Sequence, residues 1–340
     1  MIHILKNLNS NVTDFYLDVV GKMFEQNTNE KYEFLNITDI CKCNKNDIIV
    51  VSIVLDFIKL YFKGFRNIVF WVQGLEPEES YLKHGSKFKC RMLNILSKFA
   101  MKHAIGIILV SDYMLNFIEH KFNISLKEKS FVMPCFNDII NKSAFYEDNK
   151  YSQNTFCYVG SLSKWQYFEQ TLKFYMKLET LLDNTKLFVY TPEKEKATNI
   201  LEKLGIKNYQ VDFVAATELN SRLKEVKFGF ILREDIDVNR VATPTKLSSY
   251  LSAGVIPIYS ACLKDFNEVS ESMKYTVPVY NTSEIPCHLI ELCECDINCE
   301  DIYNEYIEIF KTYYSVEHYV QQSKNWILNI MDCLKRFKNF

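Results

Sequence analysis

Glycine is scarce in this chain, and its nine glycines form no dinucleotide-binding fingerprint. The loop expected after a first strand reads NLNSN at residues 7–11, where a glycine-rich turn would otherwise stand. The GxGxxG pattern needs its glycines for a tight turn and for close approach of the backbone to a pyrophosphate. Its absence makes a dinucleotide oxidoreductase the weakest of the candidate functions.

Long apolar runs, paired cysteines and an excess of one charge are also missing. No stretch approaches the roughly twenty apolar residues of a membrane span, and the N-terminal MIHILKNLNS has no small-residue cleavage site. The eleven cysteines include no Cys-x-x-Cys pair, which argues against structural zinc and favours reduced thiols. A net charge of −2 argues against general nucleic-acid binding. We therefore expect a cytoplasmic protein that holds no metal ion.

The chain is long enough for two domains with separate cores, since 48% of its 340 residues are hydrophobic. Apolar runs alternate with segments of helical periodicity, which predicts doubly wound α/β domains. A polar stretch at residues 141–154 is interpreted as the linker. We expect domains at residues 1–148 and 149–315, followed by a helical segment at 316–340. The predicted strands lie at residues 2–5, 48–54, 67–72, 105–111, 155–160, 186–190, 209–213, 227–232 and 255–259.

Residues 226–260 are the most informative stretch, because they predict a strand, a polar loop, a helix and a second strand. The first strand ends at Arg233, and Pro244 opens a short helix with Lys246 in its first turn. In an open parallel sheet, ligands bind at this carboxyl edge, and helix N-termini with nearby cations favour phosphate. Alternatively, this is an ordinary strand and helix whose Arg and Lys side chains are solvated and bind no ligand.

The same stretch resembles the carboxyl-terminal domain of retaining GT-B glycosyltransferases of the family-4 type, which include bacterial surface-polysaccharide enzymes. Members often carry Ser/Thr-Pro-Thr-Lys-x-x-Glu-Tyr-Leu-x-x-Gly-x-Pro-Val-Ile, and residues 242–258 read ATPTKLSSYLSAGVIPI. In the family, the Glu of this motif typically holds the ribose hydroxyls of the donor. Here that position is Ser249, whose hydroxyl offers one neutral contact in place of a carboxylate.

The resemblance implies two Rossmann-like domains facing a cleft, with a C-terminal helix that crosses back to the first domain. It further implies a nucleoside diphosphate sugar as co-substrate, no cofactor, and catalysis by Arg233 and Lys246 without a metal. Asp235-Ile236-Asp237 matches Asp-x-Asp in letters but lies in a loop that the family uses without metal. The implied donor-binding residues are Gly160, Ser161, Lys164, Thr191, Asn239, Arg240, Thr245 and Ser249.

A second site is expected in the first domain, where the strand at residues 67–72 is followed by polar and acidic groups. Gln73 stands where many family members carry a catalytic His, and Glu76 and Glu79 are candidate acceptor-binding residues. A neutral amide can bind hydroxyls but cannot act as a base near neutral pH. Alternatively, the glutamates stabilise a helix start through the macrodipole and bind no substrate.

Residues 87–103 predict a basic amphipathic helix. Such a helix could rest on an anionic membrane, where a lipid-linked acceptor would lie. A helix packed on the sheet with a solvated basic face is the commoner alternative.

Together these features predict retaining transfer of a sugar from a UDP- or GDP-sugar to a glycan or lipid-linked glycan, in surface-polysaccharide biosynthesis. The expected location is the cytoplasm, including the inner face of the membrane. Two other functions remain open. A nucleotide-sugar epimerase would turn over without an acceptor, and a noncatalytic glycosyltransferase-like subunit would bind nucleotide weakly or not at all.

Overall fold

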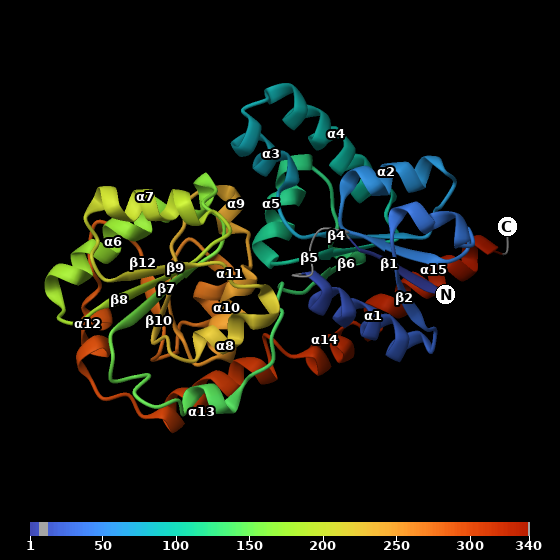
Figure 1. The fold of residues 1–340 in the computed structure, drawn as a ribbon. Helices are drawn as coiled ribbons and strands as arrows, with labels where there is room; N and C mark the ends of the chain where they lie inside the picture. Colours follow the sequence, from blue (N-terminus) through green and yellow to red (C-terminus); the bar gives the residue numbers. More distant parts are fainter. Residues whose placement is uncertain (7–12, 339–340) are drawn as a thin grey trace. The chain divides into compact units, whose positions relative to one another are not determined.

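The structure is a computed structural model that describes residues 1–6 and 13–338. The chain divides into two compact units, each built around a six-stranded parallel sheet (Figure 1). The first unit comprises Met1–Asn137, Val241–Thr243 and Ser315–Phe340, and the second comprises Asp138–Arg240 and Pro244–Tyr314. The NLNSN segment that lacks a glycine fingerprint lies outside the described residues. None of the described helices is long and apolar enough to cross a membrane.

The first sheet has the strand order β2-β1-β3-β4-β5-β6. Its inner strands are buried along their whole length, which explains their continuous apolar sequences. The strands predicted from those apolar runs are confirmed, whereas the partly exposed β2 and β6 were not predicted. The strands are β1 (Ile2–Leu5), β2 (Tyr32–Leu35), β3 (Ile48–Val51), β4 (Ile68–Val72), β5 (Gly106–Leu109) and β6 (Ser130–Val132).

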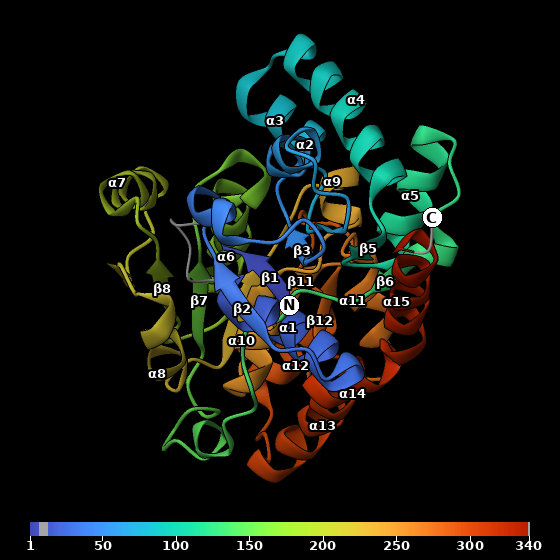
Figure 2. The ribbon, with the colours of Figure 1, turned by 90° about the vertical axis from the view of Figure 1, so that its right-hand side faces the viewer.

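Helices cover both faces of the first sheet. Those that follow β3, β4 and β5 lie on one face, with α2, α3 and α4 side by side (Figures 1 and 2). α1 lies on the other face together with α14 and α15. The helices are α1 (Asp14–Thr28), α2 (Val54–Phe62), α3 (Glu76–His84), α4 (Lys87–His103), α5 (Asp112–Phe122), α14 (Val316–Gln322) and α15 (Lys324–Lys338), and short 3-10 turns span Ile37–Lys42 and Lys127–Lys129.

The C-terminal helices belong to the first unit. The predicted helical stretch is divided at Ser323, whose hydroxyl donates to the carbonyl of Val320 at 3.0 Å. Trp326 of α15 donates from Nε1 to the carbonyl of Lys129 at 2.8 Å, and its ring packs edge-on against Phe24 of α1. These contacts hold the C-terminal segment on the sheet face that α1 covers.

The second sheet has the order β12-β11-β10-β7-β8-β9, again with all pairs parallel. α6 and α7 cover one face, and α8 and α10 cover the other (Figure 1). Its strands are β7 (Thr155–Val159), β8 (Lys186–Tyr190), β9 (Tyr209–Asp212), β10 (Phe228–Ile231), β11 (Ile256–Ser260) and β12 (Val277–Val279). Its helices are α6 (Phe168–Leu181), α7 (Lys194–Leu204), α8 (Leu219–Leu223), α9 (Asp237–Arg240), α10 (Thr245–Ser252), α11 (Lys264–Val269), α12 (Cys287–Glu294) and α13 (Cys299–Lys311), with 3-10 turns at Lys142–Phe145, Lys164–Gln166 and Ala216–Glu218.

The polar stretch at residues 141–154 differs from the expected linker, because it packs inside the second unit. Lys150 is buried, and its Nζ donates to the carbonyls of Ala144 at 3.0 Å, Leu223 at 3.4 Å and Ala253. The Tyr151 hydroxyl donates to the carbonyl of Gly254 at 2.8 Å. The second unit therefore begins at Asp138, ahead of the boundary after residue 148 that the sequence suggested.

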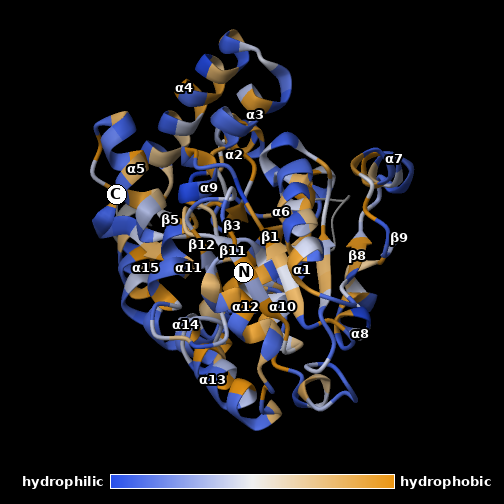
Figure 3. Cartoon of the chain, turned by 90° about the vertical axis from the view of Figure 1, so that its left-hand side faces the viewer, coloured by the Kyte–Doolittle hydropathy of each residue, from blue (hydrophilic) through white to orange (hydrophobic). Residues whose placement is uncertain are grey.

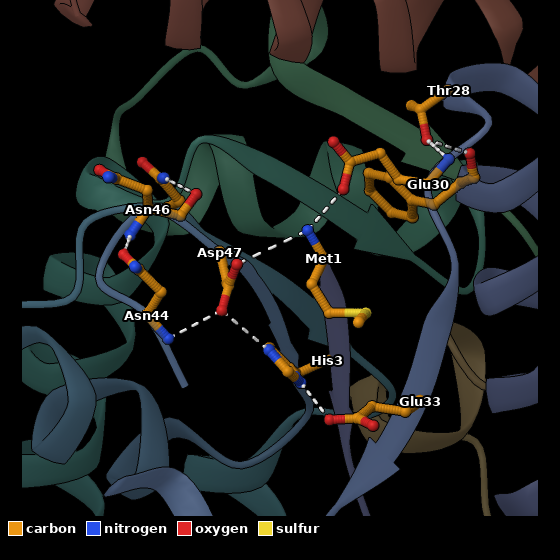
Figure 4. A network of polar contacts seen from close by, with 10 residues as sticks. Met1, His3, Thr28, Glu30, Glu33, Asn44, Asn46 and Asp47 are labelled. Carbon is orange, nitrogen blue, oxygen red and sulfur yellow. Dashed lines mark hydrogen bonds and ion pairs between the residues drawn. The ribbon is translucent and has the colours of Figure 1, made fainter. Parts of the chain in front are cut away.

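A polar cluster ties β1 to its neighbours at the edge of the first sheet (Figure 4). The buried His3 ring lies between two carboxylates, with Nδ1 3.0 Å from Oε1 of Glu33 and Nε2 3.1 Å from Oδ2 of Asp47. The backbone N–H of Asn44 also donates to Oδ2 of Asp47 at 2.8 Å. Burial opposes ionisation of Asp47, but the hydrogen bonds from His3 and Asn44 outweigh it and lower the pKa of this carboxyl.

Candidate functional site

Three of the predicted site residues meet at the carboxyl edge of the second sheet. β7 and β10 are neighbours, and Gly160 follows the first while Arg233 follows the second. α10 begins at Thr245 and brings Lys246 to the same edge. Gly160 has a φ of 134°, and a Cβ at this position would overlap the Nζ of Lys246. Glycine therefore leaves the space that the lysine side chain fills.

Lys246 is held by groups of the second unit. Its Nζ donates to Oε1 of Gln166 at 2.7 Å and lies 5.6 Å from the centroid of the Tyr158 ring. Burial and the nearby charge of Arg233 hold the pKa of Lys246 well below its ordinary value. Neither Gln166 nor Tyr158 is predicted as a partner of Lys246 from sequence patterns. Gln166 is placed by the conformation of a loop, and Tyr158 by the pleat of β7.

Arg233 is only 8% exposed and is fixed through its backbone. Its N–H donates to the Ser260 hydroxyl at 2.8 Å, and that hydroxyl donates to its carbonyl at 3.1 Å. One guanidinium nitrogen donates to the Trp165 carbonyl at 3.4 Å, and burial lowers the pKa of the group. Within the described ranges neither Arg233 nor Lys246 forms an ion pair with a carboxylate. Two adjacent cations without a counter-ion suit a multivalent anion.

A pocket of about 260 Å³ opens beside Arg233 in the second unit. This volume is close to the lower limit of about 300 Å³ for small-ligand pockets. Its wall is mainly polar, so it suits a hydroxylated or charged group more than an apolar one. The lining residues include Tyr167, Ser260, Cys262, Lys264, Tyr280 and Asn281.

The loop between β10 and α10 is ordered by internal contacts of two other predicted donor-binding residues. Arg240 donates from Nε to Asp235 at 2.7 Å and from Nη1 to Asp237 at 3.1 Å. Its guanidinium thus engages both aspartates of the Asp-x-Asp match. The buried Asn239 donates to the carbonyl of Glu234 at 2.9 Å, which closes the turn after Arg233.

Three further predicted donor-binding residues, Ser161, Lys164 and Thr191, lie in the loops that follow β7 and β8. Thr191 follows β8 and is buried, with its hydroxyl accepting from the Glu193 amide at 3.2 Å. The Ser161 hydroxyl shares a 3.0 Å hydrogen bond with that of Ser163. Lys164 is exposed at the start of a 3-10 turn. The ends of β7 and β8 thus bring Ser161 and Thr191 to the sheet edge. The position of Lys164 is set by the conformation of the loop after β7.

Ser249 is 1% exposed, and its hydroxyl is engaged by a carboxylate that sequence reasoning missed. Its Oγ donates to Oδ2 of Asp138 at 2.6 Å, and the Asn220 amide donates to Oδ1 at 2.6 Å. Burial raises the pKa of Asp138, although both hydrogen bonds oppose that shift. Asp138 lies 111 residues before Ser249, so no local pattern could have paired them.

The predicted acceptor residues of the first unit lie between the end of β4 and the start of α3. The Nε2 of Gln73 is buried and has no hydrogen-bond partner among the described residues. A Cβ at Gly74 would overlap the carboxylate of Glu79, so this glycine makes room for the acid. Burial raises the pKa of Glu76, and burial together with the charge of Glu76 raises that of Glu79. These groups can bind hydroxyls, and the two acids can hold a proton at higher pH than exposed glutamates.

No protein-family model and no curated protein matches this sequence. Solved structures do match its fold. A variant of S. aureus TarM in complex with fondaparinux, alpha-GlcNAc-glycerol and UDP is 12% identical, with a TM-score of 0.64, over 86% of this chain and 58% of that chain. HepE of Anabaena in complex with UDP and glucose is 10% identical, with a TM-score of 0.58, over 100% of this chain and 99% of that chain.

A third match is the pneumococcal O-GlcNAc transferase GtfA in complex with UDP and GlcNAc, at 10% identity and a TM-score of 0.51. It extends over 89% of this chain and 57% of that chain. The chain therefore spans somewhat more than half the length of TarM and GtfA and nearly the whole of HepE. The two parallel sheets and these matches establish the GT-B fold with two Rossmann-like domains.

Proposed function

We propose that this chain transfers a sugar from a nucleoside diphosphate sugar, UDP- or GDP-linked, to a glycan or lipid-linked glycan with retention of configuration. The observation that carries the proposal is the pair Arg233 and Lys246 at the carboxyl edge of the second sheet, without carboxylate partners among the described residues. The UDP complexes of proteins with the same fold support a nucleotide in this role.

The two cations would act on the leaving group. As the glycosidic bond breaks, negative charge grows on the diphosphate, and fixed positive charges stabilise that transition state more than the ground state. Lys246 is poised for this task because a bound diphosphate offsets the burial and the repulsion that depress its pKa. We propose that the pair replaces the divalent metal used by other transferases.

The first unit would hold the acceptor. The Gln73 amide has a free donor among the described contacts, and Glu79 and Glu76 supply acceptor oxygens for sugar hydroxyls. The proposed setting is surface-polysaccharide assembly in the cytoplasm, on the inner face of the membrane when the acceptor is lipid-linked.

The test is a transfer assay with UDP- and GDP-sugars and a panel of glycan acceptors. We expect release of nucleotide that depends on the acceptor, a product whose anomeric proton shows retention, and full activity in EDTA. Lys246→Met and Arg233→Gln should abolish turnover. Lys203→Ala removes an exposed positive charge on α7 and should leave turnover unchanged. Loss of activity in EDTA with recovery in manganese would overturn the two-cation mechanism.

A noncatalytic glycosyltransferase-like subunit is the second candidate. It is favoured by Ser249, which replaces the usual Glu and donates its hydrogen bond to Asp138. The same assay separates the candidates. Nucleotide binding without transfer to any acceptor supports the noncatalytic subunit, and acceptor-independent conversion of the donor sugar indicates an epimerase.

A further inference from the structure

α4 carries an apolar surface on each of two faces. Its inner face packs into the first unit through buried Leu93, Ser97, Ala100 and Met101. Its outer face presents Phe88, Met92, Ile95 and Phe99, at the i, i+4, i+7, i+11 spacing of one helical stripe. Phe88 is 79% exposed and Ile95 66% exposed. Figure 3 shows the resulting alternation of hydrophobic and hydrophilic residues along α4. Packing against α2, α3 and the rest of the first unit explains the inner face only.

The outer apolar surface continues onto α2. Phe62 at the end of that helix is 76% exposed, and its ring stacks on Phe99 with 6.2 Å between centroids and 9° between planes. Phe99 also meets the Tyr61 ring edge-on at 5.0 Å. We call Phe62, Phe88, Met92, Ile95 and Phe99 the apolar stripe.

Positive charge borders the apolar stripe. α4 has no Asp or Glu, and none of its lysines or its arginine forms an ion pair within the described part of the chain. At 100° per residue, Arg91, Lys98 and Lys102 lie along one side of the stripe and Lys89 along the other. A groove of about 580 Å³ beside α4 is lined by Lys87, Arg91 and Lys98 together with apolar side chains.

We propose that the apolar stripe and its bordering cations dock this protein on the surface of an anionic lipid bilayer. Aromatic and aliphatic side chains would enter the boundary between headgroups and acyl chains, while the lysines and arginine meet lipid phosphates. A second copy fits this face poorly, because self-pairing would oppose two sets of positive charges with no acidic residue on α4 to balance them. The docking goes beyond sugar transfer and does not depend on the nucleotide site.

The test is co-sedimentation of the full chain with vesicles of phosphatidylcholine alone or of phosphatidylcholine with phosphatidylglycerol. We expect binding to the anionic vesicles that weakens as salt is added, and little binding to the neutral ones. Arg91→Glu/Lys98→Glu should reduce the partition coefficient more than about tenfold, because each basic residue near the surface contributes about fivefold. Phe88→Ser/Ile95→Ser should reduce it by at least about tenfold, since it removes two apolar anchors.

Matched variants in the second unit serve as controls. Leu181→Ser/Phe213→Ser removes exposed apolar side chains, and Lys196→Glu/Lys203→Glu reverses exposed charges on α7. All four double variants should keep the unfolding midpoint of the wild type and its stabilisation by UDP, so loss of vesicle binding is not loss of the fold or of the nucleotide site. Equal binding of the stripe variants and the wild type would overturn the proposal. So would a wild-type dimer in solution that the stripe variants cannot form.

Discussion

The Ser249 hydroxyl donates a 2.6 Å hydrogen bond to the Asp138 carboxylate inside the second unit. A carboxylate therefore does lie next to the position where the motif that this stretch resembles has a Glu, but a distant residue supplies it. The Asn220 side-chain amide donates to its other oxygen, so neutral donors at both oxygens stabilise the acid.

Ser249→Ala should destabilise the second unit by about 1–3 kcal/mol, because the buried Asp138 carboxylate loses the hydrogen bond from the Ser249 hydroxyl. Urea denaturation followed by intrinsic fluorescence measures the effect. Ser248→Ala is the control on the same helix, since its hydroxyl donates to the carbonyl of Thr245 one turn earlier. Equal losses for both variants would mean that the contact with Asp138 adds nothing.

Binding of UDP should take up a proton at a pH between the pKa of Lys246 in the free protein and its pKa in the complex. The pKa of Lys246 is depressed by burial and by Arg233, and a diphosphate raises it by favouring the charged amine. Calorimetric titrations in PIPES and in Tris should therefore give different observed heats, because the two buffers differ in ionisation enthalpy. Lys246→Arg stays protonated throughout and should show the same heat in both. Identical heats for the wild type at every pH from about 6 to 9 would contradict a depressed pKa in the free protein.

Gly160→Ala should weaken nucleotide binding, because its Cβ would displace the Lys246 amine. Gly205→Ala is the matched control, since Gly205 also has a positive φ, of 74°, but no atom within 4 Å of an added Cβ. Both variants incur backbone strain of about 1 kcal/mol or more. Only the first should lower the affinity for UDP, measured by the same titration. A similar affinity loss in both would assign the effect to backbone strain.

Asp47→Asn should lower the unfolding midpoint of the first unit at neutral pH. The pKa of Asp47 is lower in the folded state than in the unfolded state, where it is about 3.9. The ionised carboxylate therefore contributes its full stability above a pH of about 3.9. That stability is lost as the pH falls through the folded-state pKa. The gap between variant and wild type should therefore shrink below pH of about 4. Asp39→Asn, which breaks an exposed pair with Lys42, should change little at any pH.

The sequence predicted the arrangement of the sheet edge because strand ends in a parallel sheet converge. Gly160, Arg233 and Lys246 each follow or flank an apolar run, and the run fixes where the polar residue emerges. The contacts of Lys246 with Gln166 and of Ser249 with Asp138 depend on loop conformations between residues far apart in sequence, which periodicity does not encode.

Residues 141–154 show the other limit of sequence patterns. A polar and charged stretch that includes Lys142 and Lys150 predicts a linker, because lysine is rarely buried. Lys150 is buried because three backbone carbonyls surround its amine, and those carbonyls come from separate parts of the second unit. The partly exposed edge strands β2 and β6 escaped prediction for a related reason, since they lack a continuous apolar run.

Thermal stabilisation by nucleoside diphosphates tests most directly the claim that Arg233 and Lys246 form the diphosphate site. A ligand that binds only the native state raises the midpoint in proportion to the logarithm of its concentration over its dissociation constant, once it is in excess. We predict that UDP or GDP raises the wild-type midpoint and that neither Arg233→Gln nor Lys246→Met responds, while Lys203→Ala responds like the wild type. No shift at millimolar nucleotide, or equal shifts in all four proteins, would contradict the account.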